Sequence, residues 1–321
     1  MVVDDNERIL ITGGCGFLGR YLIKGLLKKY KNIEIVTLSR NENNVMKTIT
    51  LCNDVRLRPI IGDIKDIDSV KYALKDVDTV MHLAAMKHID LCEANPTEAI
   101  NINVNGTKNL LDSFKGKKFI AMSTDKAVEP LGCYGATKLL MEKLVLERAR
   151  SDSSRKYSIV RSGNIFGSSG SVIERWQQQI KNNNKITITN PEMTRFFTNV
   201  DSLVGFMIGV LENSESEKIY IPYQKVIKLK DLASCVISGA DGDGLVQTVV
   251  ILGIFLGYGR HDVLEILAKV RRFHVIVLVT TRLCYNLGSW VIEGLNTQVD
   301  TEVYAIPGYG RLTFAGSVWP P

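Results

Sequence analysis

The chain has 321 residues, of which 45% are hydrophobic and 23% are charged, as in an ordinary globular protein with one large domain or a large and a small one. The formal net charge is +6, and the basic residues are spread along the chain, which argues against a nucleic-acid groove. The acidic first residues do not resemble a signal peptide, and the most apolar run, residues 245–259, is too short to span a bilayer, so we expect a cytoplasmic protein without a membrane segment.

The six cysteines and four histidines are scattered along the chain. No C-x-x-C pair occurs, and the histidines have no ligand spacing. We therefore expect reduced thiols and no metal site.

Short apolar runs alternate with amphipathic segments in the first half of the chain. We expect strands at residues 8–12, 33–38, 56–62, 77–83, 118–123 and 157–161, and helices at 16–30, 91–113 and 139–149. This alternation is typical of βαβ units. It predicts an α/β fold, a doubly wound parallel sheet of the Rossmann type with a smaller C-terminal substrate lobe.

The segment TGGCGFLG places Gly13, Gly16 and Gly19 between the first expected strand and the first helix, with Phe17 and Leu18 between the last two. A dinucleotide pyrophosphate approaches the backbone closely at such a helix N-terminus, where unpaired N–H groups and the helix dipole receive it. These five residues are therefore predicted to bind a dinucleotide. The alternative is a glycine-rich turn that binds nothing.

The second expected strand ends with Ser39 and Arg40, where an NAD-preferring site has an acidic residue. A guanidinium suits the 2′-phosphate of NADP, so NADP is predicted rather than NAD, unless Arg40 is only a solvated surface charge. Further cofactor contacts are expected from residues that follow the third and fourth strands, namely Asp63, Ile64, Ala84 and Ala85.

Tyr134 and Lys138 are four residues apart at the start of an expected helix, so their side chains project from one face. A nearby ammonium lowers the pKa of a tyrosine from its usual value near 10 and makes the phenol a usable base. This pair is predicted to remove a proton from a hydroxyl group while a hydride leaves for the nicotinamide. The pattern also occurs by chance.

TGGCGFLG together with CYGATK resembles the extended short-chain dehydrogenase/reductases, which act on nucleotide sugars. The segments STDKA, HLAAMKH, RSGNIFGSSGSV and MTRF narrow the resemblance, over about residues 8–232, to the inverting UDP-N-acetylglucosamine 4,6-dehydratases of surface-sugar synthesis. These enzymes oxidise C4, eliminate water across C5 and C6, and return the hydride to C6.

The resemblance implies a role for each residue of the catalytic segment. Tyr134 with Lys138 would oxidise C4, and Thr124 would hydrogen-bond the C4 oxygen. Asp125 would protonate the departing C6 hydroxyl, and Lys126 would remove the C5 proton. The alternative is that Asp125 and Lys126 form a surface ion pair, which contributes under about 1 kcal/mol.

The resemblance also implies a UDP-sugar substrate, a homo-oligomer, and substrate contacts from Lys87, Asn164 and Arg195. Each of these three residues could equally have a structural role.

Two other functions stay open. One is UDP-sugar 4-epimerisation, which needs Tyr134 and Lys138 only, and the other is a non-catalytic NADP-binding protein or inactive enzyme.

The composition changes near residue 232, since only 6 of the 40 lysines and arginines lie in the last 89 residues. The resemblance also ends here, because CVISGADGDGLVQTVVIL replaces the family's usual loop. The segment is either a small apolar lobe or a frame-shifted or foreign piece. We therefore expect an NADP-binding domain with the catalytic segment at 1–165, a substrate-binding part at 166–232, and an atypical region at 233–321.

Overall fold

The computed structural model describes residues 6–183 and 185–240. The chain divides into two compact units. The first contains the described residues up to Arg175 together with Glu192–Lys228, and the second contains Trp176–Pro191 together with the described residues from Leu229 onward.

The first unit is built on a seven-stranded sheet in the order β3-β2-β1-β4-β5-β6-β9, in which every neighbouring pair is parallel. The chain order reverses between β1 and β4, where Thr12 and His82 are paired at the strand ends. Open α/β sheets bind their ligands in the crevice at this reversal. The strands are β1 (Arg8–Thr12), β2 (Glu34–Ser39), β3 (Leu57–Ile61), β4 (Thr79–His82), β5 (Lys118–Thr124), β6 (Lys156–Ser162) and β9 (Lys218–Tyr220).

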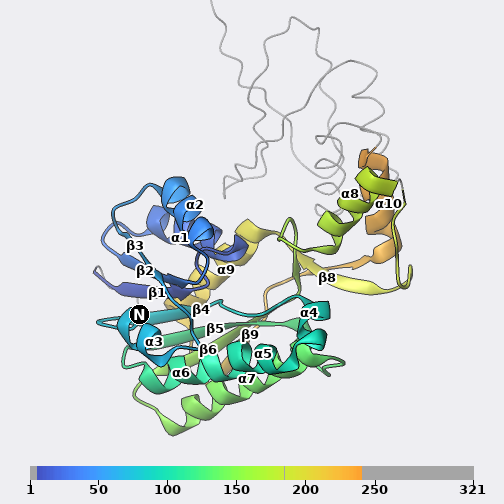
Figure 1. The fold of residues 1–321 in the computed structure, drawn as a ribbon. Helices are drawn as coiled ribbons and strands as arrows, with labels where there is room; N and C mark the ends of the chain where they lie inside the picture. Colours follow the sequence, from blue (N-terminus) through green and yellow to red (C-terminus); the bar gives the residue numbers. More distant parts are fainter. Residues whose placement is uncertain (1–5, 184, 241–321) are drawn as a thin grey trace, which may run out of the picture. The chain divides into compact units, whose positions relative to one another are not determined.

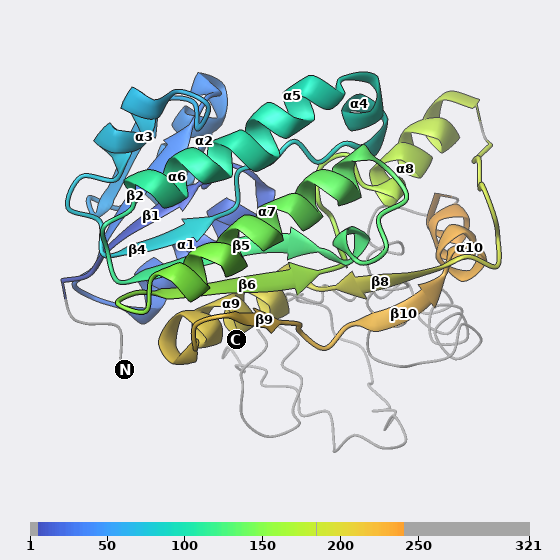
Figure 2. The same ribbon diagram turned by 90° about the horizontal axis from the view of Figure 1, so that it is seen from below.

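Helices cover both faces of this sheet (Figure 1). One face carries α1 (Phe17–Lys29) and α9 (Val200–Asn213), with α2 (Glu42–Cys52) beside α1. The other carries α3 (Ile67–Ala73), α6 (Gly106–Ser113) and α7 (Cys133–Ser151), and Figure 2 shows α6 and α7 side by side across the strands. The sequence prediction of a doubly wound sheet is confirmed.

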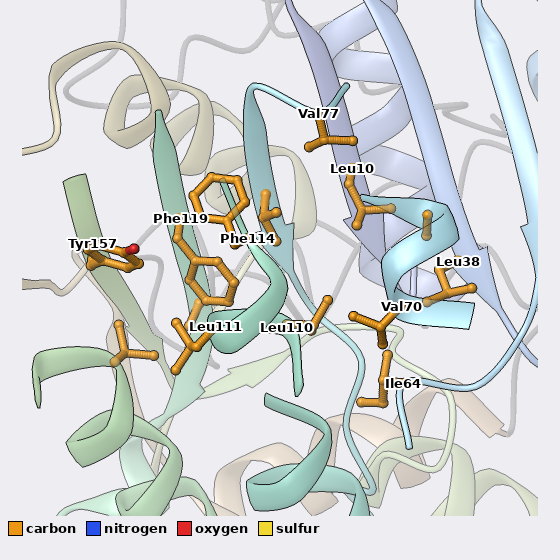
Figure 3. Close-up of a cluster of buried hydrophobic side chains, with 14 of the residues drawn as sticks. Leu10, Leu38, Ile64, Val70, Val77, Leu110, Leu111, Phe114, Phe119 and Tyr157 are labelled. Atoms are coloured by element: carbon orange, nitrogen blue, oxygen red, sulfur yellow. The ribbon is translucent and has the colours of Figure 1, made fainter. Parts of the chain in front are cut away.

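Alternating strand residues divide the core into two clusters, because successive side chains of a strand point to opposite faces. In β1, Ile9 and Ile11 pack toward α1 and α9, whereas Leu10 packs toward α3, α6 and α7. The second cluster contains the aromatic rings of Phe114, Phe119 and Tyr157, whose centroids lie 5.8 to 6.4 Å apart (Figure 3). Burial on both faces explains why these strands are continuous apolar runs.

A smaller three-stranded sheet, also in the first unit, has the order β10-β8-β7. It contains β7 (Asn164–Ile165), β8 (Thr194–Thr198) and β10 (Lys225–Lys228), with β10 antiparallel to β8 and β7 parallel to it. One residue separates the end of β6 from the start of β7, so the chain passes directly from the large sheet into the small one.

The second unit contains the greater part of α8 (Val172–Asn183) and α10 (Leu229–Ala240). Trp176 is 1% exposed, and its indole N–H donates to the Thr187 carbonyl at 2.9 Å. α10 runs without interruption across residue 232, where the composition changes. The rest of the atypical region, with the apolar run 245–259, lies outside the described residues.

All six expected strands are present, with ends shifted by at most two residues. The expected helix at 91–113 is wrong as a single element. The chain forms α4 (Ile89–Ala94), α5 (Pro96–Ile100), a π-helical turn η1 (Asn101–Asn105) and then α6. Pro96 ends the first piece because proline lacks an N–H group and restricts the residue before it, and it then occupies the first position of α5.

Candidate active site

The glycine loop joins β1 to α1 beside the end of β4. Gly13 has φ +68°, and a Cβ there would lie 2.8 Å from the Ala84 amide nitrogen, so the loop requires glycine for both its backbone angle and its close packing. The N-cap Gly16 makes no side-chain cap, and the first turn of α1 contains no acidic residue. This helix end therefore offers N–H groups and positive potential without a competing carboxylate, which fits dinucleotide phosphates.

The ends of β2 and β3 carry a group of opposite charges. Arg40 is 54% exposed, and its Nη1 lies 3.7 Å from Asp63 Oδ2. Lys65 Nζ lies 3.7 Å from the same oxygen and 2.8 Å from Glu98 Oε1. Ser39 Oγ accepts a hydrogen bond from the Cys15 amide at 3.4 Å and so supports the glycine loop. Arg40 is thus placed near the predicted cofactor end with one carboxylate partner.

Two other predicted cofactor residues have structural contacts. The side chain of Ile64 is 5% exposed and packs in the cluster of Figure 3, so only its backbone is available to a ligand. The Ala84 amide donates to Thr12 Oγ1 at 3.3 Å, which fixes the segment after β4 against the end of β1. Its neighbour Ala85 is half-buried in the same segment.

The predicted catalytic segment begins where β5 ends at Thr124 and turns through the 3-10 helix η2 (Asp125–Ala127). Asp125 Oδ1 accepts a hydrogen bond from Thr124 Oγ1 at 2.9 Å and lies 3.0 Å from Lys126 Nζ. Lys126 Nζ also donates to Asn164 Oδ1 at 3.3 Å. The side chains of Asp125 and Lys126 are 22% and 28% exposed, so the pair is partly buried but still accessible to a ligand.

Tyr134 lies in the first turn of α7, which packs closely on η2. A Cβ on Gly135 would lie 2.2 Å from the Lys126 carbonyl oxygen, so glycine at this position lets the two elements approach. A hydrogen bond with Thr124 lowers the pKa of Tyr134, but burial has the larger effect and raises this pKa to about 12. This differs from the expectation that Lys138 lowers it.

Lys138 is 3% exposed, and its Nζ donates to the Met122 carbonyl at 2.6 Å. Burial lowers the pKa of Lys138 to about 8, and the charge of Glu142 acts in the opposite direction. The ammonium is therefore held by the end of β5 and titrates near neutral pH.

Of the three predicted substrate residues, Asn164 is the one whose described contacts reach a side chain that is predicted to be catalytic. Its Oδ1 accepts from Lys126, and its Nδ2 donates to the Phe196 carbonyl at 3.2 Å. Lys87 Nζ donates to the Ser169 carbonyl at 2.8 Å, and Arg195 Nη1 donates to the Thr194 carbonyl at 2.9 Å. Their predicted roles toward a substrate stay predictions.

Sequence reasoning missed several buried polar residues beneath the site. His82, Asn103 and Glu142 make side-chain hydrogen bonds to immediate neighbours of the predicted site residues, and the partly buried Arg161 binds Glu142. Glu142 was detectable in principle, because it lies four residues after Lys138 on the same buried helix face. Asn103 had no such signal, since its position depends on the π-helical turn.

Within residues 6–183 and 185–240, no group of three or more His, Cys, Asp or Glu side chains is arranged to hold a metal ion. A helix long and apolar enough to cross a membrane is likewise absent from this described part.

The family described as "Polysaccharide biosynthesis protein" matches residues 9–266. The chain belongs to this family. The match includes the first unit from Ile9 of β1 onward and extends past residue 232.

Three curated relatives illustrate the range of the family. An uncharacterized membrane protein of Methanocaldococcus jannaschii is 38% identical over 72% of this chain and 71% of its own. The inverting UDP-N-acetylglucosamine 4,6-dehydratase of Campylobacter jejuni is 35% identical over 81% and 78%. The UDP-glucose 4-epimerase of Rickettsia bellii is 37% identical over 73% and 70%. The chain is thus similar to nucleotide-sugar enzymes of two kinds.

Solved structures agree with this placement. The X-ray structure of Pen from Bacillus thuringiensis has a TM-score of 0.71 and 34% identity, with coverage of 75% of this chain and 78% of that one. DesIV, a dTDP-glucose 4,6-dehydratase from Streptomyces venezuelae with NAD and TYD bound, has a TM-score of 0.67 and 23% identity over 74% and 82%. The fold is that of the dehydratases and epimerases of the short-chain dehydrogenase/reductase class.

Proposed function

We propose that the protein is an NADP-dependent, inverting 4,6-dehydratase of UDP-N-acetylglucosamine, which supplies a precursor for a surface polysaccharide. The observation that carries this proposal is the contact between Asp125, Lys126 and Asn164 next to Thr124 and Tyr134. The segment thereby combines three groups that the proposed reaction requires. The phenol serves the oxidation at C4, the amine removes the C5 proton, and the acid protonates the departing C6 hydroxyl. The similarity to the dehydratase of Campylobacter jejuni supports the same assignment.

The nicotinamide dinucleotide, when bound, accepts the hydride from C4 and returns it to C6. Tyr134 in its phenolate form takes the proton of the C4 hydroxyl, and Thr124 turns its hydroxyl proton from Asp125 Oδ1 to the C4 oxygen. The resulting C4 ketone makes the C5 proton acidic. Because burial raises the pKa of Tyr134, the phenol keeps the proton that it has taken while the C4 ketone persists through the elimination and the return of the hydride to C6.

The contact between Asp125 and Lys126 can provide both groups that the elimination needs. Transfer of one proton across the 3.0 Å between Lys126 Nζ and Asp125 Oδ1 gives a neutral amine and a neutral carboxylic acid. The amine then takes the proton from C5 while the acid protonates the departing C6 hydroxyl, which leaves as water. Both groups return to their charged forms, so the pair is ready for another cycle.

NADP is proposed over NAD because Arg40 follows β2, where its exposed guanidinium can pair with a 2′-phosphate. Asp63 lies beside Arg40, so binding of the phosphate must compete with this carboxylate. The preference is tested by comparing the dissociation constants of NADP and NAD for the purified protein. Tighter binding of NAD would refute this part of the proposal.

The dehydratase proposal is tested by mass spectrometry of UDP-N-acetylglucosamine after incubation with the protein and NADP. We expect a product that has lost one water, and in deuterium oxide we expect one deuterium at C5. A substrate labelled with deuterium at C4 should carry this label to C6. An unchanged mass from folded, NADP-binding protein would refute the proposal.

The epimerase relatives support a second function, UDP-sugar 4-epimerisation, which changes the configuration at C4 without changing the mass. Lys126→Met separates the two, because only the dehydratase uses the amine. Lys143→Met, which removes an exposed lysine of α7, is the matched control. Activity that survives Lys126→Met and shows no mass change would establish the epimerase.

The location and assembly predicted from the sequence are part of the proposal. The described cysteines are free thiols, which fits a reducing cytoplasm. Ile100 on α5 and Leu140 on α7 are apolar side chains that are 42% and 51% exposed, and a second copy of the chain would remove them from water. Sedimentation measurements test for the homo-oligomer.

A further inference from the structure

A buried ion pair lies one helical turn beyond Lys138. Glu142 of α7 is 2% exposed, and Arg161 of β6 binds it through two hydrogen bonds, Nε to Oε1 at 3.0 Å and Nη2 to Oε2 at 2.6 Å. Ser123 of β5 donates a further hydrogen bond to Oε1. The carboxylate of Glu142 therefore joins α7 to the carboxyl ends of two neighbouring strands.

The two residues next to Ser123 in β5 contact the pair Lys138 and Tyr134. The residue before it, Met122, supplies the carbonyl that holds Lys138 Nζ, and the residue after it, Thr124, hydrogen-bonds Tyr134. Ser123 is also paired in register with Arg161. Glu142 is thus bonded to the strand end that sets the positions of both Lys138 and Tyr134.

Stability alone does not explain a charged pair at this place. Removing two charges from water is costly, and well-packed apolar residues can often replace a buried ion pair without loss of stability. Glu142, however, lies four residues after Lys138, so the two side chains are neighbours on one face of α7. Burial has the larger effect and disfavours the charged form of Lys138, and the charge of Glu142 favours it.

We propose that Glu142 and Arg161 are positioning residues of this site: Glu142 keeps Lys138 protonated against the Met122 carbonyl, and Arg161 limits the strength of this effect by sharing the carboxylate. The inference rests on the proposed function to the extent that Lys138 acts together with Tyr134. The charge state of Lys138 is nevertheless a property of the protein without its ligands and can be measured there.

The proposal predicts opposite effects for two substitutions. Glu142→Gln keeps the shape of the side chain but removes the negative charge, and it leaves Arg161 as an additional like charge, so the pKa of Lys138 should fall by about one unit. From a starting value of about 8, the charged fraction at pH 7.5 then decreases about threefold. Arg161→Gln leaves Lys138 as the main cation near Glu142 and should raise the pKa.

The experiment is a pH titration of the lysine side chains by carbon NMR on the full chain without ligands. The signal of Lys138 is assigned as the one that Lys138→Arg removes. Asp112→Asn is the matched control, because it breaks the ion pair between Asp112 and Arg148, which joins α6 to α7 on an exposed surface. This control should leave Lys138 unchanged. Shifts of Lys138 in the same direction for both variants, or shifts no larger than the control's, overturn the proposal.

Each single variant leaves a charge without its partner, and circular dichroism detects any loss of the fold that results. The double variant Glu142→Gln/Arg161→Gln removes both charges and keeps the test available. Its Lys138 should titrate below the wild-type value, because the charge of Glu142 acts on Lys138 in the wild type and raises its pKa. A wild-type titration in the folded double variant overturns the proposal.

The titration also separates this inference from the proposed function. If UDP-N-acetylglucosamine is unchanged by the wild-type protein while the two substitutions shift Lys138 in opposite directions, the dehydratase assignment fails and the role of Glu142 stands. If water is lost and Lys138 does not respond to either substitution, the dehydratase assignment stands and the inference fails.

Discussion

His82 offers a direct test of the polar contacts beneath the glycine loop. It is 1% exposed at the end of β4, where Nδ1 lies 2.7 Å from Thr12 Oγ1 and Nε2 lies 2.9 Å from Thr107 Oγ1. Thr107 already donates its hydroxyl proton to the Asn103 carbonyl, so it accepts from Nε2–H, and Thr12 donates to Nδ1. Only the neutral imidazole satisfies both contacts.

Burial, together with the charge of Lys138, lowers the pKa of His82 from its ordinary 6.5 to about 3. Because the folded-state pKa lies below the unfolded one, the unfolded chain binds the extra proton, and stability falls as the pH decreases from about 6.5 toward 3. Between pH 7 and pH 5 this single group removes about 2 kcal/mol from the free energy of unfolding.

The assay is urea unfolding at pH 7 and pH 5 for the wild type, for His82→Gln and for His88→Gln, which replaces an exposed histidine. Carboxylates also titrate in this range, so the loss between the two pH values is compared among the proteins. We expect this loss to be about 2 kcal/mol smaller in His82→Gln than in the other two. Equal losses in all three proteins would refute the argument.

Three further predictions concern the proposed chemistry. Lys126→Met should lower kcat by about 10²- to 10⁴-fold with unchanged NADP affinity, as measured by turnover and fluorescence titration, and retained dehydration would contradict the role of the amine. Arg40→Gln should weaken NADP binding about tenfold and leave NAD binding unchanged. The control Arg58→Gln on β3 should leave the binding of both dinucleotides unchanged. An equal effect of Arg40→Gln on both dinucleotides would contradict recognition of the 2′-phosphate. Gly13→Ala should weaken the binding of both dinucleotides, because an alanine is strained at φ +68° and its Cβ would collide with the backbone of Ala84. Unchanged affinity in calorimetry would show that the loop does not hold the cofactor.

Much of the first unit was predictable because its signals are local. Each central strand is a short apolar run, and burial on both faces of a parallel sheet requires such a run. The glycine spacing from Gly13 to Gly19 and the spacing of Tyr134 and Lys138 are likewise properties of adjacent turns. The sequence therefore determined the fold class and the family, and it supplied the residues of the site that we propose.

The tertiary structure decided the features that depend on contacts between distant segments. Pro96 and the bonds of Asn103 to Met86 and Thr137 divide an apparently continuous helix, because a side chain bound elsewhere changes the local backbone. The pKa of Tyr134 rises instead of falling, because burial between segments has the largest effect on it. Glu142 meets Arg161 only after β6 has paired with β5. Sequence spacing identifies which groups are present, and burial together with partners from other strands sets their charge.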